Sequence, residues 1–152
     1  MPRREATQED IPAIVALGAQ FHASADYGFA YTPAKIERVL KHMISSQNDL
    51  VLVSDGTGGT VTGVLLGTCY ENLWGTDLIA SELAWWFDPS SRGGRAAIHL
   101  VQDFEKWAVA KGCRLISLSM LENLKGGAVS RLYSRMGYKQ REATFLKTLA
   151  GI

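Results

Sequence analysis

The stretch Phe87-Asp88-Pro89-Ser90-Ser91-Arg92-Gly93-Gly94-Arg95-Ala96-Ala97 decides the fold of this chain. An apolar, strand-like run ends at Pro89, a short basic turn with two glycines follows, and an amphipathic helix begins at about Ala96. Backbone N–H groups at a helix N-terminus lack partners and carry positive potential. Glycines let the backbone approach a ligand closely, and arginines grip phosphate oxygens. The stretch therefore indicates either a cradle for a phosphate-bearing ligand or a solvated basic turn.

The segment after this turn gives the strongest helix signal of the chain. Its apolar side chains fall on one helical face: Ala97, Leu100, Val101, Phe104, Trp107 and Ala108. Lys111 and Gly112 are typical of a helix C-terminus. Apolar runs at 78–87 and 115–121 flank the helix and indicate strands. A strand–helix–strand crossover requires that its two strands be parallel.

The other elements are predicted from the same kinds of pattern. Before the crossover we expect a strand at 3–6, a helix from Ile11 to about His22, a helix from Pro33, and strands at 50–54 and 61–70 joined by a turn at 55–59. After it we expect a helix at about 127–136 and closing strands at 138–139 and 144–149. The sequence thus predicts one α+β domain over residues 1–152, with a mixed, mostly antiparallel sheet and one parallel strand pair.

Composition narrows the class of protein. The chain has 152 residues, 47% of them apolar and 20% charged, which fits one soluble domain with a core. Its net charge of +1 argues against nucleic acid or an anionic membrane as partner. Cys69 and Cys113 stand alone in the sequence, so we expect neither a zinc site nor a disulfide, and a reducing, cytoplasmic setting. No apolar run approaches the roughly 18 residues of a membrane span, and no signal peptide is evident.

The turn after Phe87, in this order of elements, resembles the cofactor loop of the GCN5-related N-acetyltransferase family. The family loop reads Arg/Gln-X-X-Gly-X-Gly/Ala after a strand-ending proline, and here Arg92 stands first and Ala97 last. Arg95 occupies the fourth position, where the family usually has glycine. Two interpretations remain open. Gly94, one residue earlier, lets the backbone come close to the phosphates, or the side chain of Arg95 binds them as an additional contact.

A second motif lies about forty residues downstream. Leu132-Tyr133-Ser134-Arg135-Met136-Gly137-Tyr138 is similar to the Leu-Tyr-X-X-X-Gly-Phe segment of the family, with tyrosine in place of the final phenylalanine. The family often has Asn and Ala at fixed spacing before this segment, where this chain has Gly126 and Val129. Asn123 lies three residues too early for that register and is kept as a candidate cofactor contact. The opening Arg4–Pro12 is also similar to many family N-termini.

The resemblance implies acetyl transfer from acetyl-CoA to a primary amine of a small molecule or peptide, by direct attack in a ternary complex and without a metal. It assigns the CoA pyrophosphate to six consecutive residues: Arg92, Gly93, Gly94, Arg95, Ala96 and Ala97. The pantetheine arm would pair with the strand that precedes the loop, at Trp85 and Phe87. A homodimer is a further expectation, since proteins of this kind commonly dimerise.

The chemistry needs a base and an acid. An amine with a pKa near ~10.4 must lose a proton before it attacks. Glu82 is the candidate base, because a carboxyl among apolar residues has a raised pKa, and alternation predicts that it shares the face of Trp86. Glu71 and Asp77 remain rival bases. Tyr133, which matches the family tyrosine, is the implied proton donor to the CoA thiolate.

The acceptor is the least determined part of the prediction. The candidate lining of an aromatic substrate pocket is Tyr27, Phe29, Tyr31 and Trp74, with Asp26, Asp77 or Glu82 to attract a cation. A polyamine, an amino acid, an aminoglycoside-like compound and a protein N-terminus all remain open. Because of Arg95 and the missing asparagine, a non-catalytic acyl-CoA sensor is an alternative. A nucleic-acid-binding module built on the arginines is a weaker one, given the near-neutral charge.

Overall fold

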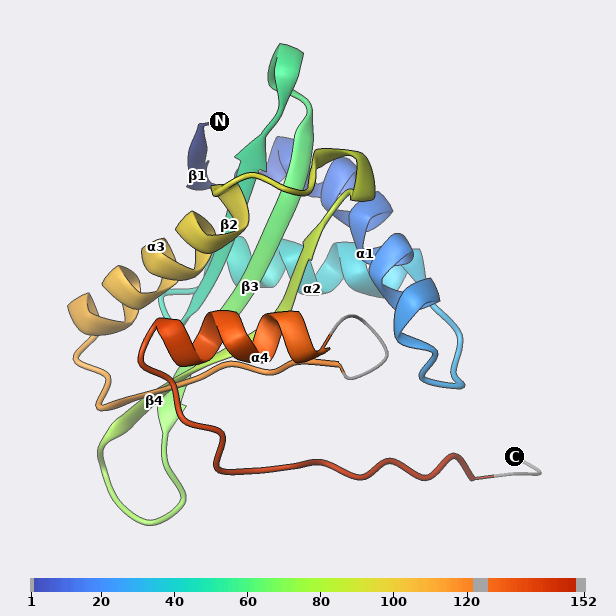
Figure 1. Ribbon diagram of the computed structural model, residues 1–152. Coiled ribbons are helices and arrows are strands. Elements are labelled where there is room, and N and C mark those ends of the chain that lie inside the picture. The colour runs from blue at the N-terminus through green and yellow to red at the C-terminus, as the bar shows by residue number, and fades with distance from the viewer. Residues whose placement is uncertain (1, 122–125, 150–152) are drawn as a thin grey trace.

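The computed structural model describes residues 2–121 and 126–149. Its five-stranded sheet has the order β1-β2-β3-β4-β5 (Figure 1). The strands are β1 (Arg3–Glu5), β2 (Asp49–Asp55), β3 (Val61–Glu71), β4 (Leu78–Phe87) and β5 (Leu115–Ser117). Neighbours from β1 to β4 are antiparallel, and β4 and β5 are parallel. The predicted mixed α+β architecture with one parallel pair is confirmed.

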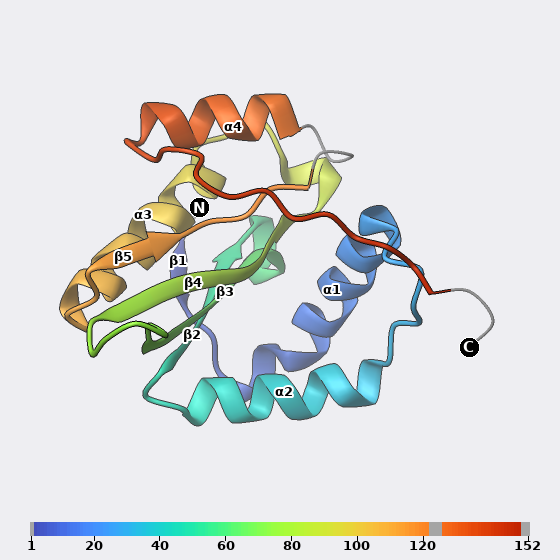
Figure 2. The same cartoon turned by 90° about the horizontal axis from the view of Figure 1, so that it is seen from below.

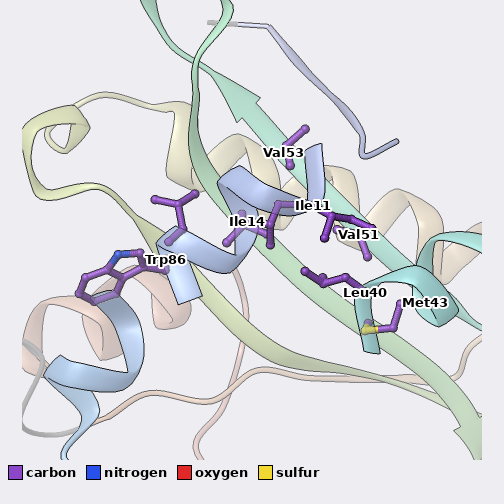
Figure 3. Packing of buried hydrophobic residues seen from close by; sticks show 9 residues of the cluster. Ile11, Ile14, Leu40, Met43, Val51, Val53 and Trp86 are labelled. Atoms are coloured by element: carbon purple, nitrogen blue, oxygen red, sulfur yellow. The ribbon is translucent and has the colours of Figure 1, made fainter. Parts of the chain in front are cut away.

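Helices cover both faces of this sheet (Figure 2). Helices α1 (Ile11–Ala25) and α2 (Pro33–Ser45) lie on one face, and α3 (Ala96–Ala110) and α4 (Gly126–Arg135) lie on the other. Strand β2 is apolar on both sides for this reason: Val51 and Val53 contact α1 and α2, whereas Leu50 and Leu52 face α3. Figure 3 shows the first of these two cores. It gathers Ile11, Ile14, Leu40, Met43, Val51, Val53 and Trp86.

A β-bulge interrupts the pairing of β3 with β4. Leu66 pairs with Ala84 and Gly67 pairs with Glu82, which leaves Leu83 without an opposite residue. One extra residue reverses the alternation of side chains beyond it. Ala80 accordingly packs in the α3 core while Trp86 packs in the α1 and α2 core. The simple alternation that would place Glu82 on the face of Trp86 is therefore wrong.

The C-terminal region departs from prediction. Strand β5 ends at Ser117 rather than at Leu121, and the described residues after it contain no strand at 138–139 or 144–149. Residues 139–149 run as an exposed, extended chain from the end of α4 to the connection between α1 and α2, where Thr148 lies against Gly28 (Figures 1 and 2). Apolar alternation favours a strand only where a partner edge is engaged, and here the segment pairs with none of the described strands.

The two cysteines, distant in sequence, meet in space. The Sγ atoms of Cys69 and Cys113 lie 3.4 Å apart, and both residues are free thiols. Burial, and then the neighbouring Cys69, raises the pKa of the Cys113 thiol to about 11. The two cysteines, which stand alone in the sequence, are therefore neighbours in the fold, although they form no disulfide. Within the described residues, no helix is long and apolar enough to cross a membrane.

Candidate active site

The loop between β4 and α3 leaves a helix N-terminus open. Gly93 has a φ of +100°, a conformation in which a side chain is strained, whereas Gly94 is outside this left-handed region. Arg95 is the N-cap of α3 and makes no side-chain capping hydrogen bond. The N–H groups of the first turn of α3 therefore remain available to an anion.

A chain of hydrogen bonds fixes this loop to α1. The indole N–H of Trp86 donates to Gln20 Oε1 (3.0 Å), and Gln20 Nε2 donates to the Asp88 carboxylate (3.0 Å). Asp88 also accepts from the backbone N–H of Ser90 (2.9 Å). Gln20 of α1 thus joins the end of β4 to the loop that follows it. Sequence reasoning missed Gln20, because an isolated glutamine in a helix carries no recognisable signal.

Arg92 and Phe87 are joined at the end of β4. Arg92 Nε donates to the Phe87 carbonyl oxygen (3.1 Å), and its guanidinium carbon lies 4.3 Å from the centroid of the Trp86 ring. The Phe87 side chain is buried in the core, where its ring lies against Gly63. Phe87 therefore does not offer its ring to a ligand, and its carbonyl oxygen is already bonded to Arg92.

Strands β4 and β5 separate halfway along β4. They pair at Ile79–Leu115, Ala80–Ile116 and Ser81–Ser117, and β4 then continues to Phe87 without a described partner on that side. The bulge at Leu83 falls just beyond the last of these pairs. The edge of β4 over residues 82–87 thus lacks a strand partner among the described residues, and a peptide-like ligand can bind to such an edge by adding as a strand.

The candidate base and the candidate acid contact the same residue at this point. The backbone N–H of Ser119 donates to Glu82 Oε2 (3.0 Å), and the hydroxyl of Tyr133 donates to the carbonyl oxygen of Ser119 (2.9 Å). Ser119 follows β5, so the separation of the strands places its peptide groups between the two side chains. Sequence reasoning missed Ser119, because it acts through its backbone.

The electrostatic environment separates the roles of Glu82 and Tyr133. Burial raises the pKa of Glu82 to about 7, although the Ser119 N–H acts in the opposite direction. Burial, and then the charge of Glu82, raises the pKa of Tyr133 above its ordinary value of 10, so its hydroxyl stays protonated at neutral pH. A carboxyl that ionises near pH 7 beside a hydroxyl that keeps its proton is suited to general base and acid catalysis.

Trp85 contributes an unused hydrogen-bond donor. Its ring lies beside that of Tyr133, with centroids 6.1 Å apart. Its indole N–H is buried and has no partner among the described residues. Buried donors are rarely left unpaired in folded proteins, so this N–H is a candidate contact for a bound ligand.

An aromatic cluster lies at the end of α1. Burial, and then the charge of Glu82, raises the pKa of Tyr27 above its ordinary value. Tyr27 stacks on Phe29 (5.2 Å between centroids), and His22 lies 6.3 Å from Tyr27. Tyr31 belongs to this cluster, but its hydroxyl donates to a backbone carbonyl of α1 (2.7 Å). The hydroxyl of Tyr31 is thus engaged within the fold, and Tyr27 remains the predicted acceptor contact of the two.

Three predicted residues lie elsewhere. Glu71, Trp74 and Asp77 are exposed at the β3–β4 turn, at the end of β4 remote from the α3 loop (Figure 1). Leu78, where β4 begins, is about 13 Å from Glu82 at ~3.3 Å per residue. The structure therefore does not bring Trp74 and Asp77 to Tyr27, and Glu71 and Asp77 are poorly placed as bases. Asn123 lies outside the described residues.

The sequence matches no protein-family model and no curated protein. Solved structures do match. An acetyltransferase from Trypanosoma brucei superposes with a TM-score of 0.76 at 16% identity, over 97% of this chain and 99% of its own. An aminoglycoside 6′-N-acetyltransferase from Acinetobacter haemolyticus gives 0.73 at 13% identity over 100% of both chains. A transcriptional regulator from Bacillus halodurans gives 0.77 at 22% identity, over 97% and 99%.

At these sequence identities, the structural similarity establishes a common fold and does not establish a common activity. The superpositions cover nearly all of each chain. The chain therefore has the fold of the GCN5-related N-acetyltransferases. This confirms the resemblance inferred from the Arg92 and Tyr133 motifs at the level of the fold.

Proposed function

We propose that the protein is an acetyl-CoA-dependent N-acetyltransferase that acts on a primary amine of a small molecule or peptide. The observation that carries the proposal is the contact of Glu82 and Tyr133 with the same residue, Ser119, at the point where β4 and β5 separate. Similar structures named acetyltransferases support the general reaction class.

The described residues fit acetyl-CoA in three places. The open N-terminus of α3, with Arg92 and Arg95 beside it, suits the pyrophosphate. The exposed edge of β4 suits the amide groups of pantetheine. The unpaired indole N–H of Trp85 lies beside Tyr133, where a polar group of the ligand would satisfy it. When bound, acetyl-CoA would supply the thioester that the amine attacks.

In this proposal each side chain has one task. Glu82 accepts the proton that the protonated amine loses before its nitrogen attacks the acetyl carbon, and the second proton, lost as the amide forms, replaces the one that Tyr133 gives up. Tyr133 gives its proton to the sulfur as the carbon–sulfur bond breaks, since a thiol of pKa ~8.5 leaves more readily when protonated. Tyr27, whose pKa is raised in part by the charge of Glu82, and Phe29, which stacks on Tyr27, would contact the acceptor.

Binding of acetyl-CoA is expected to stabilise the protein against heat. A ligand at 100 times its Kd adds about 2.7 kcal/mol to the free energy of unfolding. For a chain of this size that corresponds to a rise of roughly 5–10 °C in Tm. Thermal melts with and without millimolar acetyl-CoA measure it, with ADP as the control that lacks the pantetheine arm. An unchanged Tm would contradict the proposed cofactor.

The glycines of the loop are expected to differ in their effect on stability. Gly93→Ala forces a side chain into a positive φ and should cost about 1–2 kcal/mol. Gly94→Ala is the matched control, because a Cβ at Gly94 meets no atom within 4 Å and its φ is outside the left-handed region. Chemical denaturation measures both variants. Equal losses would show that the loop conformation described here is incorrect.

A further inference from the structure

Two thiols from distant segments meet near the C-terminal end of α3. Cys69 belongs to β3 and Cys113 follows α3, so they are 44 residues apart in sequence, yet their Sγ atoms lie 3.4 Å apart. Cys113 packs against the core cluster that contains Ala80, the residue opposite Cys69 in β4. The chain has two cysteines in all, so each is the other's only possible disulfide partner within the chain.

The placement of the two sulfurs suits a disulfide. An S–S bond is ~2.05 Å long, so the sulfurs need to approach by about 1.4 Å, which small side-chain rotations can supply. The backbone is anchored on both sides, because the Cys69 N–H donates to the Asn48 carbonyl oxygen (2.7 Å) and the Cys113 N–H donates to the Ala108 carbonyl oxygen (3.0 Å). Two reacting groups held this close react with each other far faster than free groups do.

The two thiols differ in their access to solvent. Cys113 forms part of the wall of a hollow of about 330 Å³, whereas Cys69 does not line this hollow and is only 8% exposed. The apolar part of the wall includes Val109, Ile116 and Met136. A small reagent that enters the hollow therefore reaches Cys113 first, and Cys69 lies behind it as the second thiol.

The environment of Cys113 sets the rate of its reaction. Burial, and then the contact with Cys69, raises the pKa of Cys113 to about 11, although Lys111 acts in the opposite direction. The ionisable groups that also line the hollow are Glu105, Arg114 and Tyr138. Because the thiolate is the reacting form, attack is slow at neutral pH and faster in alkaline solution. In a reducing compartment the pair would stay as thiols until oxidised small thiols accumulate.

We propose that Cys69 and Cys113 form a site of reversible oxidation, at which a low-molecular-weight disulfide converts the two thiols into an intrachain disulfide. The Cys113 thiolate attacks one sulfur of the reagent, the S–S bond of the reagent breaks, and one thiolate leaves, so that a mixed disulfide forms. Cys69 then loses its proton, attacks the Sγ atom of Cys113 and displaces the second thiolate. The protein loses two electrons and two protons, and the reagent gains them as two thiols. This inference is independent of the proposed enzymatic function.

The mass of the intact chain tests the inference first. Incubation of the reduced protein with 2-hydroxyethyl disulfide at pH 9, where more of Cys113 is ionised, should remove the mass of two hydrogen atoms and add nothing. A peptide map without reductant should join the peptides of Cys69 and Cys113, and dithiothreitol should separate them again. A chain that keeps its mass, or that carries the reagent on both cysteines, overturns the inference.

Two single variants test the order of the steps. Cys69→Ser should retain the reagent as a mixed disulfide on Cys113, because no second thiol is present to displace it. Cys113→Ser is the matched control, and its buried Cys69 should remain unmodified over the same period. Modification of Cys69 in Cys113→Ser as fast as that of Cys113 in Cys69→Ser would overturn the proposed order.

The oxidised chain should also resist heat better than the reduced chain. The new bond would close a loop that contains β4, the turn at Arg92 and α3, and it would tie the connection between α3 and β5 to β3. Such a crosslink restricts the unfolded chain, and we expect a rise in Tm of roughly 4–16 °C. Thermal melts measure the shift, and Cys113→Ser after the same treatment should show none. An unchanged or lower Tm in the oxidised wild type would contradict closure in the native geometry.

Discussion

Replacing Glu82 with glutamine is expected to lower kcat/KM for acetyl transfer by about 10²–10⁴-fold, the usual contribution of a general base. Glutamine keeps the size of the side chain and can still accept the Ser119 N–H, but it cannot take a proton from the amine. Steady-state assays of CoA release measure the loss. Glu71→Gln, at the remote end of β3, is the matched control and should retain wild-type activity. Comparable rates in both variants would exclude Glu82 as the base.

The same variant should change the pH dependence of the reaction. Because the pKa of Glu82 is about 7, wild-type kcat/KM should rise tenfold per pH unit below pH 7 and level off above it. In Glu82→Gln this rise should be absent. A wild-type profile that is already flat below pH 7 would contradict the assignment.

Folding stability should depend on the ionisation of Glu82 in the opposite sense to activity: it should fall, not rise, as pH increases. Between its ordinary pKa of 4.5 and about 7 the folded chain keeps the Glu82 proton while the unfolded chain has lost it. The folded state therefore binds more protons, and the contribution of Glu82 to stability falls as pH rises through this window. The stability of the Glu82→Gln variant minus that of the wild type should therefore increase between pH 5 and pH 8. Thermal melts at both values measure this trend independently of turnover.

Replacing Tyr133 with phenylalanine is expected to lower kcat by about 10²-fold or more, because the leaving thiolate loses its proton donor. The variant keeps the ring beside Trp85 and loses one hydrogen bond, to Ser119, worth about 1 kcal/mol of stability. Steady-state kinetics with saturating amine and acetyl-CoA measure kcat.

Tyr138→Phe is the matched control for this prediction. The Tyr138 hydroxyl is also engaged, since it donates to Glu105 Oε1 (2.7 Å), so both variants remove one hydroxyl and one hydrogen bond. Tyr138→Phe should leave kcat unchanged. Equal losses of kcat in the two variants would mean that Tyr133 acts through packing and not as an acid.

Much of the fold could be predicted because its signals are local. The bounds of β4 were predicted at 78–87, since an apolar run ends at Pro89, and α3 follows from its apolar stripe. The loop at Arg92 and the segment at Tyr133 carried enough local pattern to indicate the family fold. Tyr133 was predicted from its motif and Glu82 from its place among apolar residues of a strand, and both contact Ser119 in the structure.

The rest depended on contacts between distant segments. Nothing local to Leu83 indicates a bulge, so the face of Glu82 was predicted incorrectly. Ser119 acts through its peptide groups, which every residue has. Trp74 has the right chemistry for an aromatic pocket, but the hairpin carries it to the remote end of β4. The closing strands were predicted from propensity, which does not report whether a partner edge is engaged.

Release of the CoA thiol from acetyl-CoA by the purified protein, measured with a panel of amines, tests the proposed acetyl transfer most directly. Polyamines, amino acids, aminoglycoside-like compounds and peptides with free N-termini cover the acceptor classes that remain open. We expect release that depends on one of these amines, exceeds the rate without amine, and is lost in Glu82→Gln. Saturable binding of acetyl-CoA without release in the presence of any amine would contradict it and favour an acyl-CoA sensor.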